Sequence, residues 1–248
     1  MAAAAALALS ACYGPSAGDE ASARLERERR NLLRNGDFEL GREPWFDLAG
    51  PSRPYWHGFE IADDVACRGR RSARLPLEAR EDGQAIAIHG FIQEVAPAET
   101  RDTKSGEASR ELPAILSGCY RVERWQRRLP KQYVQFVVIV WGSDTHPRAP
   151  NIQMRYVLAG IREPPFPIAN ARFVFLGGEE PETGKWIRFE RNLRKDWLEH
   201  WGALPRRYEK LRLLFEARFD GRQEPLTGAL GEAYFDDLYL GPSLGEGR

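Results

Sequence analysis

Carboxylates near the two ends of the chain are the side chains whose types and spacing could do chemistry. Glu39 follows the turn signal Asn35-Gly36, and Asp236 and Asp237 interrupt an alternating segment close to the C-terminus. Two carboxylates that flank one bond are the machinery of a glycosidase. Adjacent residues of a strand point to opposite faces, however, so Asp236 and Asp237 cannot flank the same glycosidic bond. This pair therefore does not predict hydrolysis.

Other catalytic patterns are missing or incomplete in the sequence. The Gly-x-Ser-x-Gly spacing occurs at 14–18 and 241–245, but neither copy lies between a predicted strand and a predicted helix, as a nucleophile elbow requires. The sequence contains no phosphate-binding glycine loop and no His-Glu-x-x-His. The histidines are scattered, at His57, His89, His146 and His200. Because catalytic triads assemble across a fold and not along a sequence, an enzyme built on this chain stays open as an alternative.

The charge balance argues against nucleic acid as a partner. The chain has 36 Lys and Arg and 36 Asp and Glu, which gives a formal net charge of zero. A chain without excess positive charge gains no general electrostatic attraction to a phosphate backbone. Hydrophobic residues make up 42% of the sequence, enough for a folded core. We therefore predict a globular protein that does not bind nucleic acid.

The residues after Asn31 predict β-strands. In the most regular segment, 133–141, one face carries Tyr133, Gln135, Val137, Ile139 and Trp141. Both faces are mostly apolar, so we expect a central strand that buries one face in the core. The other face would line a groove or lie beneath a covering loop. Turn residues separate further predicted strands at 85–88, 91–95, 119–125, 152–161, 172–176, 186–190, 211–219 and 233–240. This pattern favours an all-β sandwich.

One short helix interrupts the strands. Asp196 begins a spacing close to a capping box and Gly202 provides a stop, which predicts a helix near 196–202. Trp197 and Trp201 are four residues apart and share a helix face. We expect them to pin the helix over one end of the sandwich. An aromatic platform at the rim of a groove is the alternative.

The first residues resemble an export signal. A short Ala and Leu run leads into Leu9-Ser10-Ala11-Cys12, which resembles a bacterial lipobox. This predicts a signal peptide over 1–12, a lipid on Cys12, and an exported protein anchored in the bacterial cell envelope. A disordered Ala-rich tail is the alternative. Residues 13–30 are small and charged, which predicts a flexible tether with a marginal helical end.

The remaining sequence predicts one domain over 31–242 and a disordered tail over 243–248, because no composition shift marks a second domain. In an oxidising compartment Cys67 and Cys119 could form a disulfide. Two free thiols are the alternative. No CxxC pattern or Cys/His cluster points to zinc.

Two segments resemble the ends of carbohydrate-binding modules of the family 4/9/22 type. They are Asn31 to Glu39 with the following Trp45, and Tyr234 to Leu240. The segments 92–95 and 117–122 resemble strands inside such modules. The resemblance implies a jelly-roll β-sandwich with a galactose-binding-like fold and a noncatalytic domain that binds a glycan.

The same resemblance implies a structural calcium ion that joins the two ends of the domain. Carried over by position, Glu39 and Asp236 are the side-chain ligands, and Asp64 or backbone carbonyls of the loop 63–71 complete the shell. Calcium takes six to eight oxygen ligands, so this set is chemically reasonable. The arginines of the loop do not suit a cation. The alternative is that Glu39 and Asp236 accept hydrogen bonds from backbone or arginine donors.

A sugar site needs an aromatic plane together with planar polar groups. The candidate ligand-binding residues are Tyr133, Gln135, Trp141, Trp125 and Arg155. Loops that cover this face are the alternative, because Val137 and Ile139 would otherwise be exposed.

The sequence thus predicts a noncatalytic binding domain of an exported lipoprotein, with a cell-surface glycan as partner and membrane contact only through the lipid. The alternative is a structural or protein-interaction lipoprotein without a glycan ligand. An exposed aromatic strip on the sheet would favour the first function, and a covered sheet would favour the second.

Overall fold

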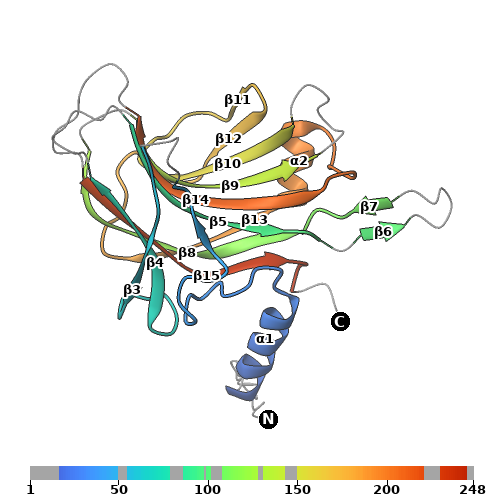
Figure 1. Ribbon diagram of the computed structural model, residues 1–248, viewed down its shortest axis with the longest axis horizontal. Coiled ribbons are helices and arrows are strands. Elements are labelled where there is room, and N and C mark those ends of the chain that lie inside the picture. Colours follow the sequence, from blue (N-terminus) through green and yellow to red (C-terminus); the bar gives the residue numbers. More distant parts are fainter. Residues whose placement is uncertain are drawn as a thin grey trace, which may run out of the picture.

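Two curved β-sheets lie face to face and form a jelly-roll β-sandwich, as the sequence predicts (Figure 1). The computed structural model describes residues 17–49, 55–78, 86–97, 99–101, 108–127, 131–142, 150–220 and 230–244. Cys12 lies outside these residues, as do the rest of the predicted signal segment and the end of the predicted tail.

The larger sheet contains eight strands in the described part of the chain. They follow the order β1-β5-β14-β9-β10-β12-β11, and β2 pairs with β5 beside β1. Their bounds are β1 Phe46–Asp47, β2 Trp56–His57, β5 Ile86–Val95, β9 Gln132–Trp141, β10 Asn151–Ala159, β11 Phe166–Ile168, β12 Ala171–Phe175 and β14 Lys210–Asp220. The pairs β10–β12 and β2–β5 are parallel. The predicted strand at 133–141 is therefore central, between β14 and β10.

The smaller sheet follows the order β13-β8-β15-β4-β3. Its strands are β3 Glu60–Asp63, β4 Arg71–Glu78, β8 Ile115–Gln126, β13 Trp186–Asn192 and β15 Leu230–Gly241. A separate hairpin of β6 (Glu99–Arg101) and β7 (Ala108–Arg110) projects from one end of the sandwich (Figure 1). Because β15 pairs with both β8 and β4, the C-terminal strand lies in the middle of its sheet.

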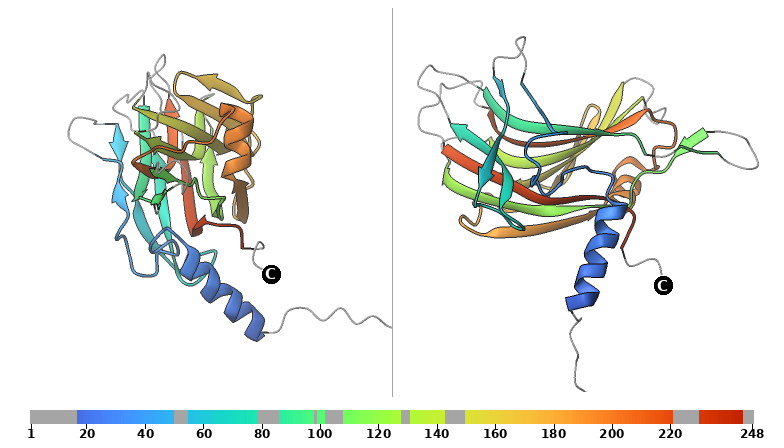
Figure 2. Two further views of the ribbon diagram at one scale, coloured as in Figure 1. Left: turned by 90° about the vertical axis from the view of Figure 1, so that its right-hand side faces the viewer. Right: turned by 60° about the horizontal axis from the view of Figure 1, so that its bottom comes forward.

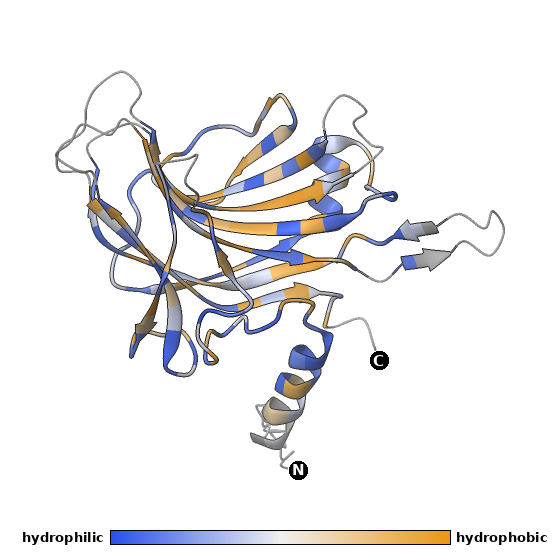
Figure 3. Cartoon of the chain, in the orientation of Figure 1, coloured by the Kyte–Doolittle hydropathy of each residue, from blue (hydrophilic) through white to orange (hydrophobic). Residues whose placement is uncertain are grey.

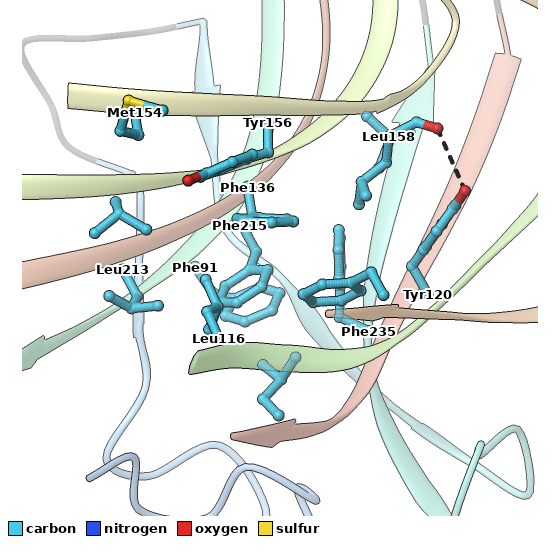
Figure 4. Close-up of a cluster of buried hydrophobic side chains, with 14 of the residues drawn as sticks. Phe91, Leu116, Tyr120, Phe136, Met154, Tyr156, Leu158, Leu213, Phe215 and Phe235 are labelled. Carbon is cyan, nitrogen blue, oxygen red and sulfur yellow. Dashed lines mark hydrogen bonds between the residues drawn. The ribbon is translucent and has the colours of Figure 1, made fainter. Parts of the chain in front are cut away.

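Aromatic side chains from both sheets meet in the core (Figure 4). Phe91 of β5 and Phe215 of β14 stack with ring centroids 5.1 Å apart, and Phe235 of β15 lies edge-on to Phe215 at 5.0 Å. All three side chains are fully buried. Burying one such ring contributes about 1.5–3 kcal/mol relative to an exposed ring. This contact therefore holds the two sheets together.

Alternation along the strands explains the core. On β9 the side chains of Val134, Phe136, Val138 and Val140 are buried between the sheets. Hydrophobic residues run along the strands of the sandwich, whereas the N-terminal helix is largely hydrophilic (Figure 3). The period of two in the sequence thus corresponds to an inner and an outer face of the sheet.

The helix α2 covers the sandwich over Leu193–Trp201, so it begins three residues before the predicted start. Asn192 is the N-cap, because its side chain accepts a hydrogen bond from the Lys195 N–H at 3.0 Å. Asp196, the predicted start, is instead buried within the helix. Trp197 is fully buried in the core, which favours the pinning role over an aromatic platform.

The predicted tether contains the helix α1 (Ala17–Arg30), which extends over more residues than the predicted helical end. Ion pairs one turn apart, such as Arg24–Glu28 at 2.7 Å, favour the helix. Arg27 anchors its last turn to Asp237 at 2.8 Å. The helix extends away from the two sheets (Figure 2). Neither described helix has the length and apolar character needed to cross a bilayer.

We predict that Asp196→Ala lowers the free energy of unfolding by about 2–3 kcal/mol. Asp196 accepts hydrogen bonds from the Arg191 guanidinium at 2.6 and 2.9 Å and from the Tyr156 hydroxyl at 2.9 Å. Removing the carboxylate leaves the buried Tyr156 hydroxyl and the partly buried Arg191 guanidinium without this acceptor. Urea unfolding at pH 7 measures the loss. Glu199→Ala, an exposed carboxylate on the same helix, is the control. Equal losses in the two variants would contradict this role for Asp196.

Candidate functional site

Glu39, the first predicted calcium ligand, binds the loop between β3 and β4 through hydrogen bonds. Its Oε1 accepts the backbone N–H groups of Arg70 at 2.6 Å and Arg71 at 2.9 Å. These bonds lower the pKa of Glu39. Gly69 has a φ of +73°, and a Cβ there would lie 2.3 Å from Glu39 Oε1. The loop can therefore approach the carboxylate this closely only with glycine at this position.

Asp236, the second predicted ligand, is fully buried and binds the same loop. Its Oδ2 accepts the N–H groups of Cys67 at 2.7 Å and Arg68 at 2.8 Å, and its Oδ1 accepts the N–H of Asp237 at 2.6 Å. Burial raises the pKa of Asp236 to about 7, and the three donors oppose this shift. A disulfide between Cys67 and Cys119 ties the loop to β8, where Cys119 is the register partner of Asp236.

These residues do not fit a calcium ion. Glu39 Oε1 and both oxygens of Asp236 accept backbone N–H groups, and these donors would repel a cation placed at the same oxygens. Asp64, the third predicted ligand, is exposed and pairs with Arg70 at 3.2 Å. Among the residues that the structure describes, no group of three or more His, Cys, Asp or Glu side chains could hold a metal ion. The contacts match the hydrogen-bonding alternative, and calcium stays a prediction of the resemblance alone.

We predict that a chelator leaves the melting temperature of the protein unchanged, because backbone hydrogen bonds to Glu39 and Asp236 hold this loop. Thermal unfolding is measured with excess EDTA and with added calcium. A bound ion would raise the midpoint with its concentration. Glu39→Ala, which removes the acceptor, should lower the midpoint, whereas Asp64→Ala should not. A midpoint that falls with EDTA and returns with calcium would contradict this account.

The outer face of the larger sheet, which is the face turned away from the core, carries four of the predicted ligand-binding residues. Tyr133, Gln135 and Trp141 alternate with the core residues of β9. Arg155 of β10 lies opposite Val137 of β9, and directly paired residues share a face. The structure therefore brings these four residues to one face, as the alternation predicts.

Trp125 does not belong to this face. It lies on β8 of the smaller sheet and packs against the core. Its ring lies between two glycines, so that a Cβ on Gly160 would come within 2.9 Å of it and a Cβ on Gly231 within 3.2 Å. The preceding Arg124 has a φ of +48°, and the pairing of β8 with β15 shifts register there. This bulge interrupts the alternation from which Trp125 was predicted.

The middle of the outer face is covered. Val137 and Ile139 are buried, although they point away from the core. Leu48 and Trp56 pack against them in a second apolar cluster, which also contains Ile88, Ile92 and Leu214. The middle of this face is thus covered, and the covering residues come from the segments around β1 and β2.

A buried carboxylate organises the polar side chains near Tyr133. Glu216 of β14 accepts a hydrogen bond from Gln135, and its Oε1 lies 3.6 Å from Arg155 and 3.5 Å from Arg218. Gln135 Oε1 and Arg218 Nε are buried without a hydrogen-bond partner. Burial raises the pKa of Tyr133. Sequence reasoning missed Glu216 and Arg218, although both alternate in phase on the predicted strand 211–219.

The other end of the outer face is built around Trp141. The guanidinium of Arg212 lies over its ring, 5.0 Å from the centroid. Arg212 and Lys210 both bind Glu94, at 2.6 and 2.7 Å. Trp141 therefore shares its ring face with a cation, and it is not a bare stacking platform.

Aromatic rings form one edge of the outer face, which we call the first aromatic edge: Phe46, Tyr55 and Trp56. Phe46 lies opposite Ile92, and Trp56 lies opposite Ile88. Phe46 is 45% exposed and Tyr55 is 37% exposed. Sequence reasoning missed these rings, because β1 and β2 are too short to show a period.

The second aromatic edge, at the opposite side of the sheet, consists of Phe166 and Phe173. Their rings stack with centroids 5.0 Å apart. Phe173 lies opposite Arg155, whose guanidinium is 5.5 Å from the ring centroid. Polar groups of the outer face thus lie between two aromatic edges.

The carboxylates on the outer face are far apart. Glu94 is the register partner of Arg212, and Glu216 and Asp220 follow at intervals of four residues along β14. Four residues of a strand span about 14 Å. The carboxyl groups of glycosidases lie about 5–10 Å apart. The described carboxylates of this face are not spaced as such a pair.

No family model matches the chain. No curated protein matches its sequence. The chain is similar to the CBM22-2 xylan-binding domain from Paenibacillus barcinonensis Xyn10C, with 11% identity, a TM-score of 0.40, and coverage of 84% of this chain and 98% of that chain.

Two other solved structures have a comparable likeness. One is CBM28, a carbohydrate-binding module specific for non-crystalline cellulose, with 7% identity, a TM-score of 0.34, and coverage of 85% of this chain and 94% of that chain. The other is a thermostable cellulase derived from Cel12A of Rhodothermus marinus, with 10% identity, a TM-score of 0.35, and coverage of 81% and 96%. Likenesses at this level do not assign an activity.

Proposed function

We propose that this protein is a noncatalytic carbohydrate-binding domain and that the glycan lies on the outer face of the larger sheet. The observation that carries the proposal is the position of the partly exposed Arg155 between two aromatic edges on one face, where the buried Glu216 and Gln135 lie beside its guanidinium. Aromatic rings stack on the apolar faces of sugars, and planar polar side chains bind their hydroxyl groups. The face offers both kinds of group.

The first aromatic edge supplies the stacking surface. Phe46 and Tyr55 already expose their rings, and Tyr55 is held edge-on to Trp56 with centroids 6.2 Å apart. A ring fixed in this way loses little entropy when a sugar stacks on it. The covered middle of the face separates this edge from the polar groups around Glu216.

The spacing of the carboxylates supports a noncatalytic role. Glu94 is neutralised by Lys210 and Arg212, and Glu216 is held by Gln135 between two arginines. Each carboxylate binds its own partners, and successive carboxylates are separated by about 14 Å along the strand. A glycan on this face would meet no pair of opposed carboxylates among the described residues.

A structural or protein-interaction role is the second candidate. It is favoured by the burial of Val137 and Ile139, because a covered sheet centre leaves less room for a long polysaccharide. The two functions differ in what the first aromatic edge binds, so one binding experiment separates them.

We predict that affinity electrophoresis and calorimetry against soluble polysaccharides, a xylan and a cellulose derivative among them, detect binding to at least one. Phe46→Ala and Tyr55→Ala should each weaken that binding about tenfold, the effect expected of a contact aromatic. Leu198→Ala is the matched control, because Leu198 is 52% exposed on α2, which contacts β13 and β8. Binding to no polysaccharide, or an equal loss in the control, would favour the second candidate.

We also propose that Cys12 carries a lipid and anchors the domain at the cell envelope. The lipobox-like Leu9-Ser10-Ala11-Cys12 supports this proposal. A single acyl chain binds a membrane only marginally, whereas two or more chains anchor stably.

We predict that the full chain, produced in a bacterium fed a radiolabelled fatty acid, incorporates label and fractionates with membranes. Cys12→Ala should abolish both, while a Ser10→Ala control should keep both. Equal labelling of the Cys12→Ala variant would show that Cys12 is not the lipid site.

A further inference from the structure

The Trp141 end of the outer face continues into a pocket of about 310 Å³. Gly142 and Glu209, which line the pocket, directly adjoin Trp141 and Lys210. The Glu209 N–H also donates to the Trp141 carbonyl at 2.8 Å. The pocket lies at the base of the β6–β7 hairpin, which projects at this end (Figure 1). It is lined by Glu99, Ser109, Arg110, Gly142, Arg206, Arg207, Tyr208 and Glu209. The pocket and the outer face therefore form one continuous surface.

Positive charge gathers on this continuous surface, although the whole chain has a net charge of zero. The basic side chains are Lys210 and Arg212 on the face and Arg110, Arg206 and Arg207 in the pocket. The acidic side chains are Glu94, Glu99 and Glu209. Among the described residues, five cations against three carboxylates leave an excess of two positive charges. Within about 10 Å, the screening length at moderate salt, such an excess attracts an anion.

Two of the cations form no ion pair shorter than 4.0 Å with a carboxylate among the described residues. Arg110 Nη1 donates to the backbone carbonyls of Tyr208 and Glu209, which fix the guanidinium without cancelling its charge. Its Nη2 is 4.0 Å from Glu99. Arg206 is exposed, and among the described residues no carboxylate pairs with it.

We propose that this end of the site binds an acidic sugar, meaning a residue that carries a carboxylate, as in a uronic acid, or a sulfate ester. The inference rests on the proposed glycan-binding function and names the class of glycan. Guanidinium groups bind such planar or tetrahedral oxyanions through charge-assisted hydrogen bonds. Trp141 with its stacked Arg212 would lie beneath the sugar ring, and Arg206 and Lys210 would meet its anionic group.

The experiment compares polygalacturonate with the same polymer fully methyl-esterified, which keeps the sugar backbone and removes the charge. The wild-type protein should bind the acidic form more tightly, and this preference should disappear as NaCl rises from 50 to 500 mM. Lys210→Gln and Arg206→Gln should each weaken binding of the acidic form about two- to fivefold, and Arg206→Gln should leave binding of neutral glycans unchanged. Arg162→Gln, which removes an equal charge beyond the opposite end of β10, should change neither.

A sulfated galactan and its desulfated form make a parallel comparison. Preference for the charged polymer in either comparison supports the inference and identifies the anion. Binding of neutral glycans with no preference in both comparisons would overturn the inference and leave the proposed function intact. Loss of preference in the Arg162→Gln control as much as in Arg206→Gln would also overturn it. Absence of binding to every glycan would overturn both proposals.

Discussion

The buried carboxylate of Asp236 is the interaction on which the closure of the sandwich depends. It lies on β15, the middle strand of the smaller sheet, and its oxygens accept N–H groups from Cys67, Arg68 and Asp237. The next residue, Asp237, pairs with Arg27 of α1 at 2.8 Å, with Arg188 of β13 at 3.2 Å and with Arg68 of the same loop at 3.7 Å. One strand thus holds both the loop and the N-terminal helix. Asp237 has a φ of +51°, and the pairing of β15 with β8 shifts register there.

The larger sheet is free to present a surface because closure is achieved elsewhere. Its strand β14 buries Leu213, Phe215 and Ala217 in the core. The alternate residues Leu214 and Glu216 then face outward, where their positions follow from the packing inside. One strand therefore contributes side chains both to the core and to the outer face. A site built on such strands is held more rigidly than one built on loops.

The sequence was sufficient to predict which side chains share a face where the alternation of a strand extends over many residues. The alternation over 133–141 placed Tyr133, Gln135 and Trp141 on one face, and the structure has them there. The same reasoning failed for Trp125, because the local residue types do not indicate the bulge at Arg124. Phe46 was missed because a strand of two residues has no period, and Tyr55 because it precedes such a strand. The helix start was misplaced because Asn192 and Asp196 are both good capping residues, and only the tertiary contacts of Asp196 decide between them. A carboxylate can bind either a cation or an N–H donor. The residue types of Glu39 and Asp236 therefore could not distinguish a calcium site from a set of hydrogen bonds.

The central claim is that the chain ends close the fold and that the outer face of the larger sheet binds the glycan. Titrating the ¹⁵N-labelled protein with a glycan that it binds, and following its backbone amide resonances, tests this claim most directly. The account predicts that shifts concentrate in β5, β9 and β14 and around Tyr55 and Trp56, and that the amides of 67–71 and 236–238 stay unchanged. Shifts concentrated in those two segments, without shifts on the outer face, would contradict this claim.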